Sequence, residues 1–209
     1  MKGHSWFDLT YSNKELLDNV ATEVVVCPKC RLCESRKKAV PGVGNPESKL
    51  VLIGEAPGRS EDIMGEPFVG AAGKFLDTLL SAIGFSRADI FITNVVKCRP
   101  PENRDPLPDE IEMCTPYLNR QIGIIQPAVI MTLGKHSTAY VFSKAGLPFR
   151  SITQAHGRVY EAVILGMKIV VFPTFHPAAA LYNAQYENQI REDFQAVRKE
   201  LLKRNLVKP

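Results

Sequence analysis

Five cysteines in the 209-residue chain are candidate metal ligands. Cys27 and Cys30 form a C-x-x-C pair, a spacing that lets two thiolates turn toward one metal centre, and Cys98 and Cys114 follow further along. Because Cys33 forms a second such pair with Cys30, the spacing leaves open which four bind. The alternatives are a tetrahedral zinc ion, an iron–sulfur cluster, or buried thiols without a ligand. A disulfide scaffold is disfavoured because the sequence shows no export signal.

Three polar residues lie after or late in apolar runs that are typical of strands. Glu55 follows the first run within the turn GEAPG, Asn94 interrupts the second run, and His176 follows the last one. A buried carboxamide is costly unless it is hydrogen-bonded, so Asn94 serves either a structural hydrogen bond or the recognition of a nucleobase edge. His176 is likewise either a cap of the following turn or a functional group.

The elements that must position these residues alternate between strands and helices. Short apolar runs rich in β-branched residues predict buried strands over 50–53, 90–96, 128–133 and 169–172. Helical periodicity predicts helices over 72–83, from residue 108 onward, and around 190–201. This alternation indicates a parallel sheet covered by helices, with ligands bound at the carboxyl ends of its strands. Glu55, Asn94 and His176 are therefore predicted to meet at one edge of the sheet. Segments 159–164 and 168–172 predict an added antiparallel pair that turns at Gly166.

The composition indicates an ordinary globular protein. With 45% hydrophobic and 23% charged residues, we expect a single domain over residues 1–209. Because no apolar run is long enough to cross a bilayer, we expect a cytoplasmic protein that does not associate with membranes. The net charge of +4 does not identify a partner, but segment 27–38 carries five basic residues and one acidic residue. This patch is either a solvated surface or a phosphate-binding one.

From Cys27 onward, several motifs in order resemble the family 4 uracil-DNA glycosylases, which occur mainly in thermophilic bacteria and archaea. The motifs are CPKCRLC, VPGVGNP, GEAPGRSED, GEPFVGAAGKFLD, ITNVVKCRPPENRDPLPDE and FHPAAAL. The resemblance implies an α/β fold of the uracil-DNA glycosylase type, a three-layer αβα sandwich around a four-stranded, mainly parallel sheet. It implies a monofunctional enzyme that flips uracil out of DNA, hydrolyses its N-glycosidic bond, releases free uracil and leaves an abasic site. Such an enzyme starts base excision repair of deaminated cytosine.

The resemblance also implies a four-iron, four-sulfur cluster with Cys33 as the spare cysteine. Its ligands would be Cys27, Cys30, Cys98 and Cys114. We interpret the cluster as a structural clamp that ties the loop after Asn94 to the N-terminal cysteines. Three basic side chains of that loop, Lys97, Arg99 and Arg104, are expected to contact DNA.

Each motif residue has a role that the resemblance implies. Phe68 would stack on uracil, although an aromatic residue beside a proline and a valine is also typical of a core. Asn94 would hydrogen-bond the uracil edge, and His176 would face the pyrimidine O2, where negative charge develops. The pocket would be lined by backbone groups of Gly54, Glu55 and Ala56.

The residue that assists the attacking water is less clearly marked. In the best-known uracil-DNA glycosylases it is an aspartate, and Ala56 stands at the corresponding place. The catalytic candidates are therefore His176 and Asn94, together with Glu55 or Glu61 to order water or stabilise the sugar cation. Glu61 has a second interpretation, the rejection of the methyl group of thymine.

A wedge residue that fills the gap left by the flipped base is expected after the histidine motif. Leu181 is the candidate, with Ala180 as the alternative. The expected partner is uracil-containing DNA, single- or double-stranded; replication or repair proteins are further candidates, and we expect a monomer. The rival hypothesis is a noncatalytic iron–sulfur or zinc DNA-binding module of the same fold. A related group that traps the sugar through a KRRIH segment is disfavoured, because the loop here reads KCRPPENRDP.

Overall fold

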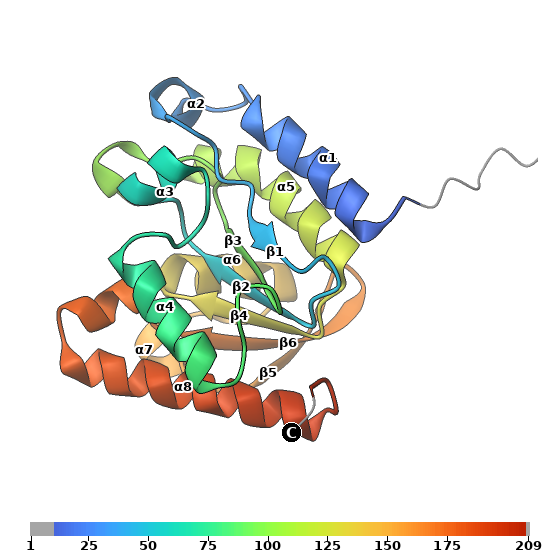
Figure 1. Ribbon diagram of the computed structural model, residues 1–209, viewed down its shortest axis with the longest axis vertical. Coiled ribbons are helices and arrows are strands. Elements are labelled where there is room, and N and C mark those ends of the chain that lie inside the picture. The colour runs from blue at the N-terminus through green and yellow to red at the C-terminus, as the bar shows by residue number, and fades with distance from the viewer. Residues whose placement is uncertain (1–10, 208–209) are drawn as a thin grey trace, which may run out of the picture.

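A computed structural model describes residues 11–207, and its centre is a six-stranded mixed sheet in the order β1-β3-β2-β4-β6-β5 (Figure 1). The strands are β1 (Val43–Gly44), β2 (Leu50–Gly54), β3 (Phe91–Asn94), β4 (Val129–Leu133), β5 (Tyr160–Ile164) and β6 (Met167–Thr174). The four predicted runs form the parallel centre, β3-β2-β4-β6. β1 and β5 pair antiparallel at the two edges. The α/β fold class is confirmed, but the predicted number of four strands was wrong.

The two edge strands differ in how visible they are in the sequence. β5 and β6 form the predicted hairpin, which turns at Leu165 and Gly166 with φ of +52° and +78°. Positive φ at both central residues is the geometry of a tight hairpin turn whose twist matches that of the strands. β1 contains two residues, too few to produce an alternating pattern.

Helices cover both faces of the sheet and make three layers. They are α1 (Asn13–Val25), α2 (Leu32–Ser35), α3 (Arg59–Met64), α4 (Ala71–Ala82), α5 (Pro108–Ile125), α6 (Lys135–Ala145), α7 (Ile152–Ala155) and α8 (Ala184–Lys203). β2 shows the division, because Val51 packs in the core shared with α1, α5 and α6, whereas Leu52 packs in the core shared with α4 and α8 (Figure 1). The αβα sandwich is therefore confirmed.

The strand ends set up the site. The second predicted strand, 90–96, is shorter than expected because regular pairing ends at Asn94. The chain then stays beside the end of β2 through hydrogen bonds from Val95 N to Gly54 O and from Val96 N to Glu55 O, both 3.0 Å. This course brings Cys98 toward α5 and leaves Asn94 at the carboxyl edge of the sheet. Between residues 11 and 207, no helix is both long and apolar enough to span a bilayer.

Candidate active site and cysteine cavity

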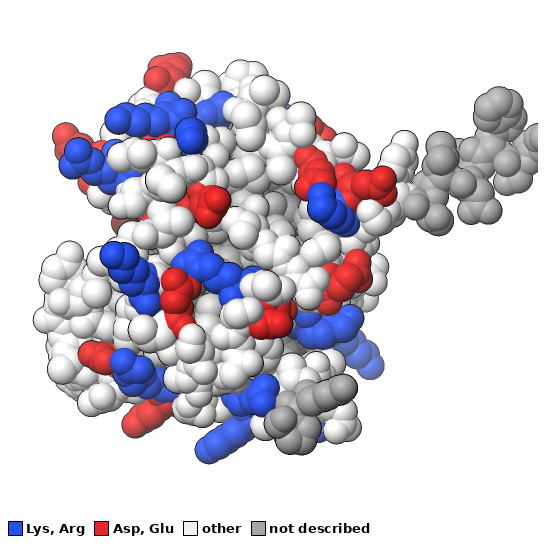
Figure 2. Space-filling model, viewed as in Figure 1, with Lys and Arg blue, Asp and Glu red and all other residues white. Residues whose placement is uncertain are grey.

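A cavity of about 370 Å³ opens at the carboxyl ends of the parallel strands. Its walls bring Glu55, Asn94 and His176 together, as the position of each residue after or late in a strand predicted. Glu61 and Phe68 also line it, from α3 and from the loop before α4. In the space-filling view the surface is hollowed on the left, between α3 and α4, and basic side chains gather around α2 above it (Figure 2).

Asn94 places an unpaired acceptor in this cavity. The residue is 2% exposed, and its Oδ1 atom has no hydrogen-bond partner within residues 11–207. A buried acceptor without a donor costs about 1–3 kcal/mol, so such an atom is expected where a ligand supplies the donor. Gly54 gives the amide its room, because a Cβ there would lie 2.3 Å from Asn94 Oδ1 and 2.7 Å from the Phe68 ring.

Phe68 lies in a strained loop that its neighbours hold in place. Its φ of +54° is rare for a residue with a large side chain, and its ring stacks on that of His176 at 5.6 Å between centroids. Glu61 Oε1 accepts hydrogen bonds from Val69 N and Gly70 N, each at 2.9 Å. The Arg87 guanidinium donates to the carbonyl of Phe68. The ring packs in the core, as the core interpretation predicts, and it also forms part of the pocket wall.

His176 is held as a neutral hydrogen-bond donor. Its Nδ1 accepts from Ala178 N at 3.1 Å, so the ring proton of the neutral form lies on Nε2. Burial lowers the pKa of His176 to about 4, against the opposing effect of the Glu61 carboxylate. The imidazole is therefore uncharged at neutral pH. The residue also caps the short 3-10 helix Pro177–Leu181, which confirms the capping interpretation, and it lines the pocket as well.

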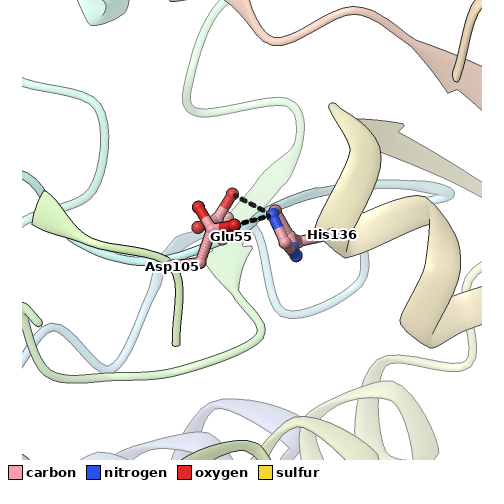
Figure 3. Close-up of side chains that lie close together, drawn as sticks. All are labelled: Glu55, Asp105 and His136. Carbon is pink, nitrogen blue, oxygen red and sulfur yellow. Dashed lines mark ion pairs between the residues drawn. The ribbon is translucent and has the colours of Figure 1, made fainter. Parts of the chain in front are cut away.

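Glu55 belongs to a cluster that sequence reasoning missed in part. Its Oε2 lies 3.9 Å from His136 Nε2, and the same nitrogen lies 2.9 Å from Asp105 Oδ2 (Figure 3). Burial raises the pKa of Glu55, while the neighbouring His136 opposes this shift. His136 follows the end of β4 by three residues, so the rule that located Glu55 would have located it too. Asp105 carries no comparable signal.

Four of the five cysteines surround a second, apolar cavity between α1 and α5. They are Cys27, Cys30, Cys98 and Cys114. Two N–H groups donate to their sulfurs, Arg36 Nη1 to Cys98 Sγ and the Lys97 backbone to Cys114 Sγ, both at 3.1 Å. Burial raises the pKa of the Cys114 thiol to about 12, so a bound cation is needed to keep it as a thiolate at neutral pH.

The spacing of these sulfurs bears on which metal they fit. A tetrahedral zinc ion with Zn–S bonds of about 2.3 Å requires sulfurs roughly 3.8 Å apart. Over residues 11–207, the one group of three or more possible ligands whose atoms all lie within 4.8 Å is Glu55, Asp105 and His136. No three of the cysteine sulfurs lie within 4.8 Å of one another in this part of the chain, so their spacing is wider than a single zinc ion requires.

The structure contradicts the prediction that Lys97 contacts DNA. The residue is 1% exposed, and its ammonium donates to Thr93 Oγ1, Asn94 O and Gln121 Oε1 at 2.5–2.8 Å. A basic residue in a loop is typical of the surface, but acceptors from β3 and α5 turn the Lys97 side chain inward. Lys97 stabilises the fold beneath the pocket instead.

The other predicted DNA contacts lie at or near the surface. Arg99 is half-buried and donates to Asn103 Oδ1 at 2.7 Å. Arg104 lines the pocket, and its guanidinium forms two hydrogen bonds with the Glu110 carboxylate, at 2.6 and 2.9 Å. Leu181 is 48% exposed, whereas Ala180 packs against the core, so the exposed surface favours Leu181 as the wedge.

Comparisons with known proteins agree with this geometry. The model of the uracil DNA glycosylase superfamily matches residues 41–202. A type-4 uracil-DNA glycosylase of Saccharolobus solfataricus is 55% identical over 186 residues, which cover 88% of this chain and 86% of that protein. The type-4 enzyme of Archaeoglobus fulgidus is 47% identical, covering 88% of this chain and 92% of its own length. That of Thermotoga maritima is 44% identical, covering 85% and 89%. The chain therefore belongs to the uracil DNA glycosylase superfamily and, within it, to the type-4 uracil-DNA glycosylases.

Proposed function

We propose that the protein is a uracil-DNA glycosylase that hydrolyses the bond between uracil and deoxyribose and so starts base excision repair. The observation that carries this proposal is the buried, unpaired Oδ1 of Asn94, which faces a pocket walled by Phe68 and a neutral His176. A pocket at a sheet edge requires the nucleotide to be extruded from the duplex before its base can enter.

Base recognition rests on Asn94 and Phe68. Uracil presents an N3–H donor between two carbonyl oxygens, and the Asn94 Oδ1 acceptor matches that donor. Cytosine presents an acceptor at N3, so it would face Oδ1 with a lone pair and leave the amide unpaired. Discrimination against a base that lacks the matching group is stronger than discrimination by shape alone. The Phe68 ring offers a flat apolar surface against which the pyrimidine packs.

His176 stabilises the departing base. When the C1′–N1 bond breaks, its electron pair stays on uracil, and the negative charge is shared with O2. A neutral imidazole whose Nε2 carries the proton donates a hydrogen bond to that oxygen without adding a charge that would have to be buried. A donor aimed at developing charge contributes about 3–4 kcal/mol of transition-state stabilisation.

The two candidate carboxylates have different surroundings. Glu61 Oε1 is occupied by the backbone of Val69 and Gly70, so Glu61 holds the Phe68 loop in shape. The Glu55 carboxylate, whose pKa is raised by burial, faces the pocket mouth and His136. We therefore assign the water to Glu55. The oxygen of that water attacks C1′ as the C1′–N1 bond breaks, and the carboxylate orients the water, takes up the proton it releases and stabilises the positive charge on the sugar.

We further propose that Cys27, Cys30, Cys98 and Cys114 hold a four-iron, four-sulfur cluster. The four line one cavity without Cys33, no three of their sulfurs lie within 4.8 Å of one another, and N–H donors face two of them. The bound cluster would cross-link the segment after α1, the end of β3 and α5. Its contribution is structural, and the glycosidic bond is cleaved by the pocket residues.

The cluster has a direct test. Purified protein is expected to show broad visible absorbance together with iron and acid-labile sulfide. A C98S variant should lose the absorbance, and C33S is the matched control that should keep it. Stoichiometric zinc without iron, or equal loss of absorbance in C33S, would contradict the proposed ligand set.

The test of the enzyme uses oligonucleotides that differ at one base. Uracil-, thymine- and cytosine-containing strands, single and paired, are incubated with the protein, and abasic sites are then cleaved with alkali. We expect breaks at uracil alone, and an H176A variant measures the background of breaks that do not depend on the pocket. A folded, cluster-containing protein that binds these strands without producing breaks would instead be the noncatalytic module.

Several finer assignments belong to the same proposal. Arg99, Arg104 and Leu181 are proposed to contact the DNA around the pocket mouth, with Leu181 as the wedge. The protein is proposed to act as one domain and as a monomer. Replication or repair proteins are the candidate protein partners.

A further inference from the structure

The Glu55 cluster joins three separate segments at one ring nitrogen. Glu55 follows β2, Asp105 lies in the loop between residues 103 and 108, and His136 lies in the first turn of α6. Figure 3 shows both carboxylates directed toward the imidazole, whose Nε2 lies 2.9 Å from Asp105 Oδ2 and 3.9 Å from Glu55 Oε2. Two carboxylates this close repel each other unless a donor or a cation lies between them.

The same contact fixes the loop that forms one wall of the pocket. Pro100, Asn103 and Arg104 line the pocket, and Asp105 follows them directly. Because the Asp105 side chain is 71% exposed, its pairing with His136 is not required for burial. The ion pair between Asp105 and His136 attaches this loop to α6, beside Glu55.

We propose that His136, held by Asp105, is a positioning residue that orients the Glu55 carboxylate for the attacking water and closes the 99–107 loop against it. This inference rests on the proposed function, in which Glu55 orders that water. His136 touches neither the base nor the sugar in this arrangement and acts through Glu55.

The electrostatics around Glu55 give the proposal a pH signature. Burial raises the pKa of Glu55, His136 and Lys135 lower it, and Asp105 raises it. The other ionisable groups that line the pocket are Glu61, Arg104 and His176. Because His136 lowers the pKa of Glu55, removing the imidazole should raise that pKa and move the acid limb of the kcat/KM profile to higher pH. Losing the Asp105 charge should move that limb to lower pH.

The experiment compares H136Q, D105N, the double variant and wild type on a single-stranded uracil oligonucleotide between about pH 4.5 and 8. We expect H136Q to lower kcat by about tenfold at pH 6 with KM nearly unchanged, and the two single variants to shift the acid limb in opposite directions. Their effects should be non-additive in the double variant, because the two residues act as one pair. R120Q, which removes a remote exposed ion pair with Glu23, is the matched control and should behave as wild type.

Four outcomes would overturn the proposal and can be told apart. An H136Q profile identical to wild type, with E55Q strongly impaired, rejects the positioning role alone. If E55Q is also unimpaired, the assigned role of Glu55 is what fails, and if wild type releases no uracil, the proposed function fails. Activity that EDTA abolishes and Zn²⁺ restores would make the three side chains a metal site instead of a positioning pair.

Discussion

The pocket and the cysteine cavity meet at the end of β3, and a buried polar side chain in each region differs in whether it has hydrogen-bond partners. On the pocket side, Asn94 is 2% exposed and its Oδ1 has no partner in the described part of the chain. On the cysteine side, Lys97 is 1% exposed and its ammonium has three acceptors. The two side chains are equally buried, but the Asn94 acceptor lacks a hydrogen-bond partner whereas the Lys97 amine has three.

The difference separates binding from structure. A buried polar atom left unpaired lowers the free energy of unfolding, so it persists where a ligand completes it. A buried amine whose donors are all used is required by the fold itself. Substitutions in the pocket are therefore expected to lower activity with little effect on stability. Substitutions beside the cysteine cavity are expected to lower mainly the free energy of unfolding. The following variants test that contrast.

The largest effect is expected at His176. An H176A variant should lower kcat for uracil release by about 10²–10³-fold, because it removes the donor to the pyrimidine O2. Single-turnover kinetics on a uracil oligonucleotide measure this loss, and the melting temperature and visible absorbance should change little. Since burial lowers the pKa of His176 to about 4, the shape of the pH–rate profile between about pH 5 and 8 should be the same in both proteins. A limb in that range that disappears in H176A would show that the histidine titrates during catalysis.

The contrast itself is tested by N94A and K97M. N94A should lower kcat/KM by about 10–100-fold, since one base-edge hydrogen bond contributes about 1–3 kcal/mol. Its melting temperature should be unchanged or higher, because an unpaired acceptor has been removed. K97M removes the donor that Thr93 Oγ1, Asn94 O and Gln121 Oε1 share, and it should lower the free energy of unfolding by about 1–3 kcal/mol, several degrees in melting temperature. The contrast is refuted if N94A is the less stable of the two variants.

A smaller effect is expected at Gly54, which gives Asn94 and Phe68 their close approach. A Cβ at Gly54 would lie 2.3 Å from Asn94 Oδ1, so G54A should displace the amide and cost about 1–3 kcal/mol of stability as well as activity. Gly123 in α5 is the matched control, because a Cβ there meets nothing within 4 Å. G123A should therefore raise the free energy of unfolding by up to about 1 kcal/mol. Equal melting temperatures for the two variants would show that the Asn94 and Phe68 side chains can move to make room for a Cβ at Gly54.

The parallel strands and the meeting of the polar residues at one edge could be predicted from the sequence, because both follow from local patterns of residues. Apolar runs marked the four parallel strands, Gly84 at φ +75° ends α4 as predicted, and each polar residue after a strand reaches the same edge. The failures have a common cause in long-range contacts. Two acceptors of the Lys97 side chain lie only three and four residues away, but the third, Gln121 Oε1, lies 24 residues further on, and Asp105 contacts the distant His136. Neither partner is visible from the segment that needs it.

The smallest effect is expected at Arg36, which donates hydrogen bonds beside the cysteine cavity. Arg36 Nη1 donates to Cys98 Sγ and to Cys27 O, and Nη2 donates to Val25 O. R36M removes these donors and should lower the free energy of unfolding by about 1 kcal/mol, and it should shorten the half-life of the visible absorbance under an iron chelator.

Arg31, five positions earlier, supplies the control for Arg36. Its guanidinium is 60% exposed and pairs with Asp109, so R31M should have a smaller effect on melting temperature and none on the absorbance half-life. Salt should weaken the Arg31 pair and leave the partly buried Arg36 contacts nearly unchanged. If R36M and R31M proved equal in both measurements, the donors to the cysteine side would be no more than surface contacts, and the contrast with the pocket would rest on Lys97 alone.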